Sequence, residues 1–505
     1  MRAIISVAER EGLVDLAHEL QSHDVTIYAT STTRKALKTR HIDAHPLDEL
    51  SGFPAILDGS VAALHPLIMG GVMAQRDQAH HTTEMRSHHI TPIDLVVVNF
   101  FPFGREAAFD EALEQIDVGG AALIRAAAKN FRTVIVLVRP QDYASVMQEW
   151  REQGEVSLET RRRLAVTAFQ YLASYDSMVA EHLRTATGTL FPDELTLPLH
   201  LVQNLHYGEN PHQQAALYRW RDSETTAAPT LAGAQILAGE PLSFNNLLDL
   251  DVALRTVQCF TAPTVTIIKH TNPCGLACDD NLLDAYRKAH AGDPVSASGG
   301  VIGSNRPIDE PTAQEICQLF YEAVIAPGFT PEALELLRKK KSLHLLTTRS
   351  PIEPASMSTQ MLLAGPPDVR SVSGGLLLQT PDIKGEPESE YEVVTEREPN
   401  LAEITDLKFA WKAVRQVKSN AIVLAHKLML LGVGAGQMHR AVSVQLALDK
   451  AGPRARGSIM ASDASFPFAD GIEMAARAGI TAIIQPGGSP RDDEAIRQAN
   501  RYAIA

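Results

Sequence analysis

Cysteine is scarce in this chain, with four residues among 505. Cys274 and Cys278 are close enough in sequence to suggest a zinc site, but zinc deaminases combine H-x-E with P-C-x-x-C. Here the spacing is P-C-x-x-x-C, and the chain contains no H-x-E. We therefore expect no metal, no bound cofactor, and four reduced thiols of the kind found in cytoplasmic proteins.

Positive charge and long apolar runs are also lacking. The formal net charge is −14, whereas a protein that binds nucleic acid needs a basic face. No run approaches the roughly 18 apolar residues of a membrane helix. Met1 leads directly into an expected strand, which argues against a signal peptide. We therefore expect a cytoplasmic protein that binds neither nucleic acid nor membrane.

Residues 1–197 alternate short apolar strands with helices. The expected strands are 3–7, 25–28, 95–99 and 133–138, and the expected helices are 12–20, 33–39 and 119–129. Apolar strands that alternate with helices predict a parallel sheet covered on both faces. Ligands of such sheets bind at the carboxyl ends of the strands. A proline-broken stretch at 187–199 then predicts a domain junction.

The stretch 264–305 contains the most informative chemistry. Its β-branched run 264–268 predicts a buried strand that ends in Lys269 and His270. A histidine can accept a proton near neutral pH, and a neighbouring ammonium can stabilise an oxyanion. Taken alone, such a pair is more often a solvated surface feature. After it we expect a turn at 271–273, a helix near 281–289, a stop at 292–294, a turn at 298–300 and a strand at 301–302.

The segments around this pair are similar to a known family. K-H-T-N-P-C-G at 269–275 and D-P-x-S-A-x-G-G at 293–300 resemble the transformylase half of AICAR transformylase/IMP cyclohydrolase. Y-G-E-N-P-H-Q at 207–213 and S-V-S-G-G-L-L-L-Q at 371–379 extend the resemblance. It implies a purine-biosynthesis enzyme that transfers a formyl group from the co-substrate 10-formyltetrahydrofolate to the 5-amino group of AICAR.

The resemblance also assigns roles to individual residues. Lys269 would stabilise the oxyanion, His270 would accept the amine proton, and Asn420 would orient the pair. Arg440 is assigned to substrate binding, and His206 stands where the family has an arginine that grips the nucleotide. The remaining assignments are Tyr207, Gly208, Gly299 and Glu322 for the substrate, and Asp463 and Phe466 for the folate.

The first 197 residues resemble the IMP cyclohydrolase domain, which has a methylglyoxal-synthase-like fold. Matching segments are G-L-V-D-L-A at 12–17, L-S-G-F-P-A-I-L-D-G at 50–59, N-F-F-P-F at 99–103 and R-A-A-A-K-N at 125–130. What remains of the family's site is Ser6, Arg10, Asp117 and Lys129.

Several functional groups of that site are absent. The family's phosphate loop S-T-G-G-T is A-T-S-T-T at 29–33, so both glycines that allow close backbone approach are lost. The family's lysine at 62 is Ala62, and its tyrosine at 101 is Phe101. Each lost donor or acid–base group costs roughly two to three orders of magnitude in rate. We therefore expect this domain to close the formylated intermediate to IMP poorly.

From residue 198 onward, the resemblance implies two cytidine-deaminase-like α/β subdomains without zinc, at about 198–365 and 366–505, in a homodimer that shares its transformylase sites. The family continues beyond Ala505 into a tail whose arginine also contacts the nucleotide. One alternative is a paralogue that formylates a different amine, because several anion contacts are missing. The other is a non-catalytic binding or scaffold protein, against which the intact Lys269, His270 and Asn420 argue.

Overall fold

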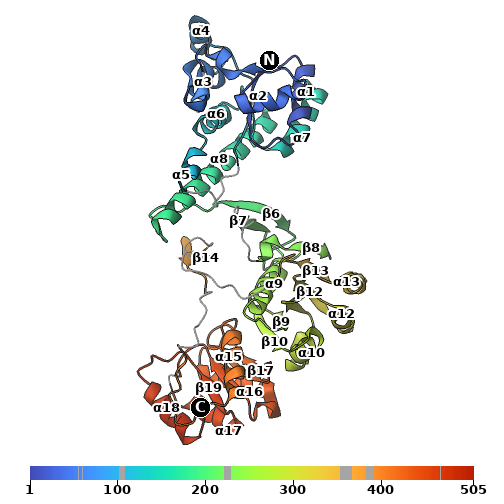
Figure 1. Ribbon diagram of the computed structural model, residues 1–505, viewed down its shortest axis with the longest axis vertical. Helices are drawn as coiled ribbons and strands as arrows, with labels where there is room; N and C mark the ends of the chain where they lie inside the picture. Colours follow the sequence, from blue (N-terminus) through green and yellow to red (C-terminus); the bar gives the residue numbers. More distant parts are fainter. Residues whose placement is uncertain are drawn as a thin grey trace. The chain divides into compact units, whose positions relative to one another are not determined.

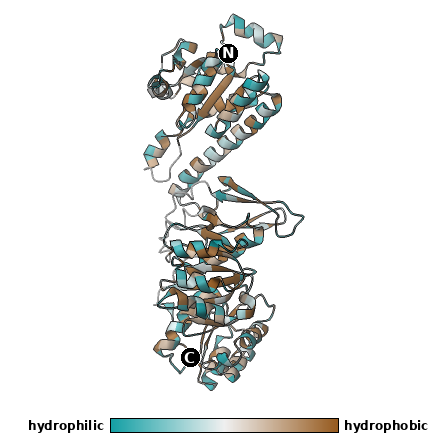
Figure 2. Ribbon diagram, turned by 90° about the vertical axis from the view of Figure 1, so that its right-hand side faces the viewer, coloured by the Kyte–Doolittle hydropathy of each residue, from teal (hydrophilic) through white to brown (hydrophobic). Residues whose placement is uncertain are grey.

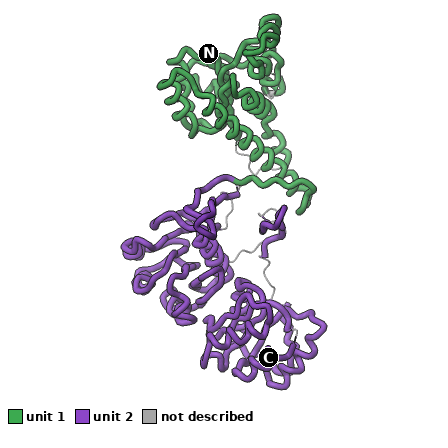
Figure 3. Tube along the Cα trace, turned by 180° about the vertical axis from the view of Figure 1, so that it is seen from behind, with its two compact units in different colours: residues 1–199 green, residues 200–505 purple. Residues whose placement is uncertain are grey.

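The computed structural model describes residues 1–54, 56–59, 61–101, 109–220, 229–352, 367–382, 390–466 and 468–505. It divides into two compact units, Met1–Leu199 and His200–Ala505 (Figure 3). Among the described residues, no helix has the length and apolarity needed to span a membrane. Three residues of the family-like segments at 50–59 and 99–103, namely Ala55, Pro102 and Phe103, lie outside the described part.

The amino-terminal unit is built on a five-stranded sheet in the order β3-β2-β1-β4-β5. Every neighbouring pair in it is parallel, which confirms the predicted sheet. All five residues of β4 are buried, as a strand covered on both faces requires, and Figure 2 shows the central strands as hydrophobic. The strands are β1 (Arg2–Val7), β2 (Thr26–Ala29), β3 (His45–Pro46), β4 (Leu95–Asn99) and β5 (Ile135–Leu137).

Helices pack around this sheet. The longest, α8, was not among the expected elements, although its ends follow simple rules. Ser157 caps its first turn by accepting a hydrogen bond from the N–H of Thr160, and Gly188 ends it in the left-handed conformation. The helices are α1 (Leu13–Ser22), α2 (Ser31–Lys38), α3 (Pro66–Met73), α4 (Ala79–Ser87), α5 (Phe109–Glu114), α6 (Val118–Lys129), α7 (Tyr143–Gln153) and α8 (Leu158–Thr187).

A ten-stranded mixed sheet runs through the carboxyl-terminal unit, in the order β19-β18-β16-β17-β10-β9-β11-β12-β13-β8. Figure 1 labels β8, β13, β12, β9, β10, β17 and β19 among its strands. The two lobes join within this sheet, because β10 of the first pairs antiparallel with β17 of the second. The strands are β8 (Gln235–Ala238), β9 (Thr264–Lys269), β10 (Asn272–Cys278), β11 (Gly300–Ser304), β12 (Tyr321–Ala326), β13 (His344–Thr347), β16 (Ile422–His426), β17 (Met429–Gly434), β18 (Ile459–Ser462) and β19 (Ala482–Ile484).

Both lobes repeat one arrangement of elements. In each, a helix leads into an antiparallel hairpin, a second helix and further strands, and the strand orders β10-β9-β11-β12 and β17-β16-β18-β19 correspond. The leading helices are α9 (Phe244–Val257) and α15 (Leu401–Val414), and the second helices are α10 (Leu282–Gly292) and α16 (Arg440–Ala451). The remaining helices are α11 (Pro294–Ala297), α12 (Glu310–Ile316), α13 (Pro331–Arg338), α17 (Asp470–Ala478) and α18 (Asp492–Arg501).

Alternation along β9 supplies apolar side chains to both faces of the sheet. Val265 and Ile267 pack with residues of α10 and α12 on one face, whereas Ile268 packs with α9 on the other. Two small two-stranded sheets complete the unit. They are β6 (Leu199–Leu205) with β7 (Ala215–Trp220), and β14 (Asp368–Val372) with β15 (Gly375–Gln379).

Two local predictions were wrong. The turn expected at 271–273 lies instead at His270 and Thr271, and Asn272 already begins β10. Pro273 lies inside this strand, where the ladder is irregular between Pro273 and Gly275, as expected for a residue without an N–H. The sequence also predicts a helix from a capping-box-like start at 400–403 to Val417, but this helix ends at Val414, and the strand β16 after it was not predicted.

Candidate functional site

Lys269 and His270 lie at the tip of the β9–β10 hairpin. His270 and Thr271 both have left-handed backbones, with φ of 53° and 59°, as a tight two-residue hairpin requires. Asp249 of α9 accepts hydrogen bonds from both N–H groups, at 3.2 Å from His270 and 2.6 Å from Thr271. The amide of Asn272 also donates to the carbonyl of His270 at 2.9 Å. Side chains from two elements therefore fix the turn.

The ammonium of Lys269 is held by the loop that follows α11. Its Nζ donates to the carbonyl oxygen of Ser298 at 2.7 Å. Gly299 has a φ of +75°, and a Cβ there would lie 3.8 Å from this Nζ and 3.5 Å from the ring of Phe320. Glycine at 299 therefore allows the loop to turn beside the ammonium.

A cavity of about 250 Å³ opens beside the pair, at the seam where the two lobes meet. The first lobe contributes Lys269, His270 and the start of β10, and the second contributes residues 430–433 of β17. At its rim, Lys450 of α16 pairs with Asp293 at 2.6 Å and so connects the lobes. Cys274 also lines the cavity, and burial raises the pKa of its thiol to about 11. It is therefore protonated at neutral pH.

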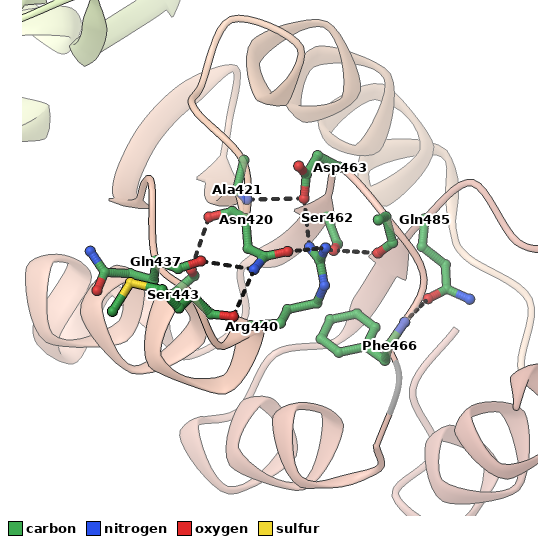
Figure 4. A network of polar contacts seen from close by, with 11 residues as sticks. Asn420, Ala421, Gln437, Arg440, Ser443, Ser462, Asp463, Phe466 and Gln485 are labelled. Atoms are coloured by element: carbon green, nitrogen blue, oxygen red, sulfur yellow. Dashed lines mark hydrogen bonds and ion pairs between the residues drawn. The ribbon is translucent and has the colours of Figure 1, made fainter. Parts of the chain in front are cut away.

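Asn420 belongs to a polar network in the second lobe (Figure 4). Its amide oxygen accepts a hydrogen bond from the guanidinium of Arg440 at 2.8 Å. Its amide nitrogen donates to the carbonyl oxygens of Gln437 and Met438, at 2.8 and 3.3 Å. Arg440 is buried and also pairs with Asp463 at 2.5 Å. Three residues that the sequence assigned to different roles are therefore in direct contact.

Asp463 is further tied to the backbone beside Asn420 by the N–H of Ala421, at 2.9 Å. Burial acts to raise its pKa, but hydrogen bonds from Arg440, Ser419 and Ala421 outweigh burial, and the net pKa is lowered. Phe466, predicted for folate binding, is 2% exposed and lies in the core of the second lobe. Its N–H donates to Gln485 at 3.0 Å.

The other predicted substrate residues lie on different elements. His206, Tyr207 and Gly208 lie on the loop after β6, where the two rings meet edge to face at 5.6 Å. Glu322 is on β12 and accepts a hydrogen bond from Asn246, the residue that completes the capping box of α9. Gly299, also predicted for the substrate, follows Ser298 in the loop that holds the ammonium of Lys269.

In the amino-terminal unit, polar side chains gather at the carboxyl ends of β1, β2 and β4. Asn99 accepts hydrogen bonds from the N–H groups of Ala8 and Glu9, both at 2.8 Å. Thr33 accepts one from Val7 at 3.0 Å, and Ser6 accepts one from the hydroxyl of Thr30 at 3.3 Å. The sequence assignments missed Asn99, although a polar residue that ends an apolar strand was a signal for it.

Asp117 is the N-cap residue of α6, where its carboxylate accepts a hydrogen bond from the N–H of Gly120 at 2.6 Å. Burial raises the pKa of this carboxyl, and the hydrogen bond opposes the shift. Lys129 lies in the last turn of the same helix, where a cation favours the helix dipole. Arg10 is exposed on the loop after β1. Both retained α6 residues thus have structural uses.

No metal site is evident in the part of the chain that the structure describes, since it holds no group of three His, Cys, Asp or Glu side chains placed to bind an ion. All four cysteines are free thiols.

The family model "AICARFT/IMPCHase bienzyme" matches residues 127–450, and the model "MGS-like domain" matches residues 12–122. "Bifunctional purine biosynthesis protein PurH" of Halalkalibacterium halodurans is 45% identical over 509 residues, which cover 100% of this chain and 97% of the relative. The protein of the same name from Anoxybacillus flavithermus is 44% identical, with the same coverage. A solved structure titled "Crystal structure of ForH" is 34% identical over 36% of this chain and 98% of that chain, with a TM-score of 0.34.

Proposed function

This chain belongs to the AICARFT/IMPCHase bienzyme family, and from that premise we propose that its carboxyl-terminal unit transfers a formyl group from 10-formyltetrahydrofolate to the 5-amino group of AICAR. The observation that carries the proposal is the hairpin turn that holds Lys269 and His270 beside the cavity at the lobe seam. The reaction is a step of purine biosynthesis and uses the folate as a co-substrate.

In the proposed reaction, the AICAR amine attacks the formyl carbon and forms a new C–N bond. His270 accepts the proton that the amine releases. The carbonyl oxygen becomes an oxyanion, and Lys269 stabilises that charge. The bond between the formyl carbon and N10 of the folate then breaks, and the imidazolium returns the proton to N10. The products are formylated AICAR and tetrahydrofolate.

Asn420 has a constrained part in this proposal. An amide nitrogen donates two hydrogen bonds, and here both go to main-chain carbonyls. A substrate contact therefore falls to the amide oxygen, which already accepts from Arg440 and keeps a second lone pair. Arg440 and Asp463 then act on the substrate site through Asn420.

The amino-terminal unit is proposed to retain the cyclohydrolase scaffold but to close the formylated intermediate to IMP poorly. Ser31 and Thr32, which replace the two glycines of the family's phosphate loop, lie in the first turn of α2. Phe101 is exposed and has no hydroxyl, and Ala62 has no cation. Asp117 and Lys129 remain available to move protons.

The test is an absorbance assay that follows AICAR and 10-formyltetrahydrofolate and resolves the products into the formylated nucleotide and IMP. We expect the formylated nucleotide to accumulate. Comparison of AICAR with its dephosphorylated nucleoside tests the paralogue, which would prefer the nucleoside. Folate binding without turnover of either amine would contradict the proposal and favour a scaffold role.

We also propose a cytoplasmic homodimer. The β14–β15 hairpin exposes Val372, Leu376 and Leu377, at 45%, 49% and 60%. An isolated two-stranded hairpin is only marginally stable in water, and a second copy that covers these side chains would stabilise it. Sedimentation equilibrium tests this, with Leu376→Asp/Leu377→Asp expected to shift the equilibrium toward monomer. Four free thiols favour a reducing compartment.

A further inference from the structure

We propose that Asp249 is a positioning residue for formyl transfer, because its carboxylate holds the left-handed hairpin turn that places His270 and Lys269 at the cavity. The proposal rests on the formyltransferase function stated above. The sequence alone gave Asp249 no role, since it lies twenty residues before the pair it serves. Its place in the fold gives it one.

The turn needs such support because of its backbone. His270 and Thr271 are consecutive L-residues with φ of 53° and 59°, a region in which a side chain crowds the backbone. Asparagine and glycine are the usual residues of this turn type, and neither is present. An outside group must therefore favour this conformation over a more open loop.

The Asp249 carboxylate has the geometry for that task. One oxygen accepts the N–H of His270 at 3.2 Å and the other accepts the N–H of Thr271 at 2.6 Å. A carboxylate accepts at both oxygens, whereas an amide of the same shape accepts at one and places an NH₂ against the second donor. Burial raises the pKa of Asp249, and the two N–H groups and His270 oppose that shift. Aspartate therefore serves this turn as a double acceptor, which asparagine cannot do.

The second lobe contains a similar hairpin turn that an aspartate holds, but no catalytic role is proposed for that turn. Asp406 of α15 accepts the N–H groups of Lys427 and Leu428, both at 2.8 Å, and these residues have φ of 52° and 55°. Asp249 and Asp406 also occupy the same place in their helices, six residues after the N-cap residues Ser243 and Asn400. Asp406 is therefore a control for Asp249, because its carboxylate fixes an equivalent turn that carries neither Lys269 nor His270.

The position of the turn matters because it fixes both functional groups at once. His270 is a turn residue, and Lys269 is the last residue of β9, with its ammonium on Ser298. Misplacement of a reacting group by about 1 Å can cost about 100-fold in rate. Loss of the carboxylate should therefore reduce turnover more than it reduces substrate binding.

The experiment compares Asp249→Asn with Asp406→Asn in the full chain. We expect both variants to lose similar thermal stability, since each loses one charged acceptor from an equivalent turn. Asp249→Asn should also lower kcat about 10- to 100-fold, with the KM for AICAR changed less than about 3-fold. Asp406→Asn should keep kcat within about 2-fold of the wild type.

A rescue variant separates turn geometry from general damage. Glycine adopts positive φ without a steric penalty. Thr271→Gly in the Asp249→Asn background should therefore raise kcat several-fold above the kcat of Asp249→Asn alone. Unchanged kcat in Asp249→Asn, equal losses in both Asp→Asn variants, or no gain from glycine would each overturn the proposal. Wild-type protein assayed in parallel tests the proposed function separately, because its failure to transfer formyl groups would overturn both.

Discussion

At Lys269 and His270, the backbone conformation of the turn determines where the two functional side chains lie. The sequence shows a general base beside an ammonium, but such pairs are common on surfaces. The structure adds a left-handed turn, a carboxylate that holds it, and a carbonyl that anchors the ammonium. These contacts make the pair a candidate for catalysis.

His270→Ala should lower formyl transfer about 10²- to 10⁴-fold, because it removes the group that accepts the amine proton. Folate affinity should change little, as measured by equilibrium fluorescence titration. The matched control is Lys427→Ala, at the corresponding turn position of the second lobe, which should leave the rate near the wild-type value. Equal rates for His270→Ala and the wild type would exclude the proposed base.

Cys274 should be unreactive near neutral pH although it lines the cavity. Burial raises its pKa to about 11, and the thiolate is the form that reacts with alkylating reagents. Its alkylation rate should therefore increase about tenfold per pH unit from pH 7 toward 10, measured by mass spectrometry of the labelled peptide. Rapid labelling at pH 7 that stops rising with pH would contradict this assignment.

Among the elements, α11 and α16 link the lobes beside the candidate site. Asp293 caps the first turn of α11 and pairs with Lys450 of α16 at 2.6 Å. The loop that follows α11 supplies the Ser298 carbonyl that holds Lys269. The Lys450–Asp293 pair between the lobes is therefore connected through α11 to the loop that holds the ammonium of Lys269.

Lys450→Met should lower kcat several-fold and cost less than about 1 kcal/mol of unfolding free energy, because Lys450 is half exposed and such ion pairs are weak. Burial acts to raise the pKa of Asp293, but Lys450 and Ser296 outweigh it and the net pKa is lowered. The stabilisation by Asp293 is thus present at neutral pH and is lost as pH falls through its lowered pKa. Urea unfolding at pH 7 and pH 3 measures this loss.

Lys339→Met on the exposed end of α13 is the matched control for Lys450→Met. It removes a lysine that pairs with Glu335 in its own helix and should change neither kcat nor the pH dependence of unfolding. If both lysine variants behave alike, the Asp293 pair has no special effect on the site.

For the whole molecule, the question is whether both units work as enzymes. The amino-terminal unit has the parallel sheet of its family, and its strand ends still gather polar groups such as Asn99 and Thr33. The groups proposed to be missing are a cation, a hydroxyl and two glycines. The scaffold can persist without them, because packing of the sheet depends on other residues.

The full chain should convert the formylated nucleotide to IMP well below the rate of an ordinary enzyme, about 1 s⁻¹. The single changes Ala62→Lys and Phe101→Tyr should each help little, since groups that act as a unit are not additive. Together with Ser31→Gly and Thr32→Gly they should raise the rate far more. The glycines lie in α2 and should cost about 1 kcal/mol each. Closure by the unmodified chain at 1 s⁻¹ or faster would show that other residues do this chemistry.

Much of the fold was predictable where local patterns are strong. Four of the five strands of the parallel sheet were placed within a few residues, because buried strands give continuous apolar runs, whereas the two-residue strand β3 was not predicted. The β9–β10 turn was misplaced, because Pro273 suggested a break in the chain, whereas the irregular ladder accommodates it. The strand β16 begins at Ile422, only a few residues after the end of α15 at Val414, and it was not predicted. Site residues could be named from motifs, but their contacts could not.

The sequence by itself determined the fold class, the likeness to a bifunctional family and the presence of Lys269, His270 and Asn420, because these depend on local pattern and residue identity. Only the tertiary structure decided what surrounds them. It brought Asp249 to the turn, joined Arg440 and Asp463 to Asn420, and closed a cavity between strands of two lobes. Such contacts join residues far apart in the chain, and they depend on how the sheet and its helices pack.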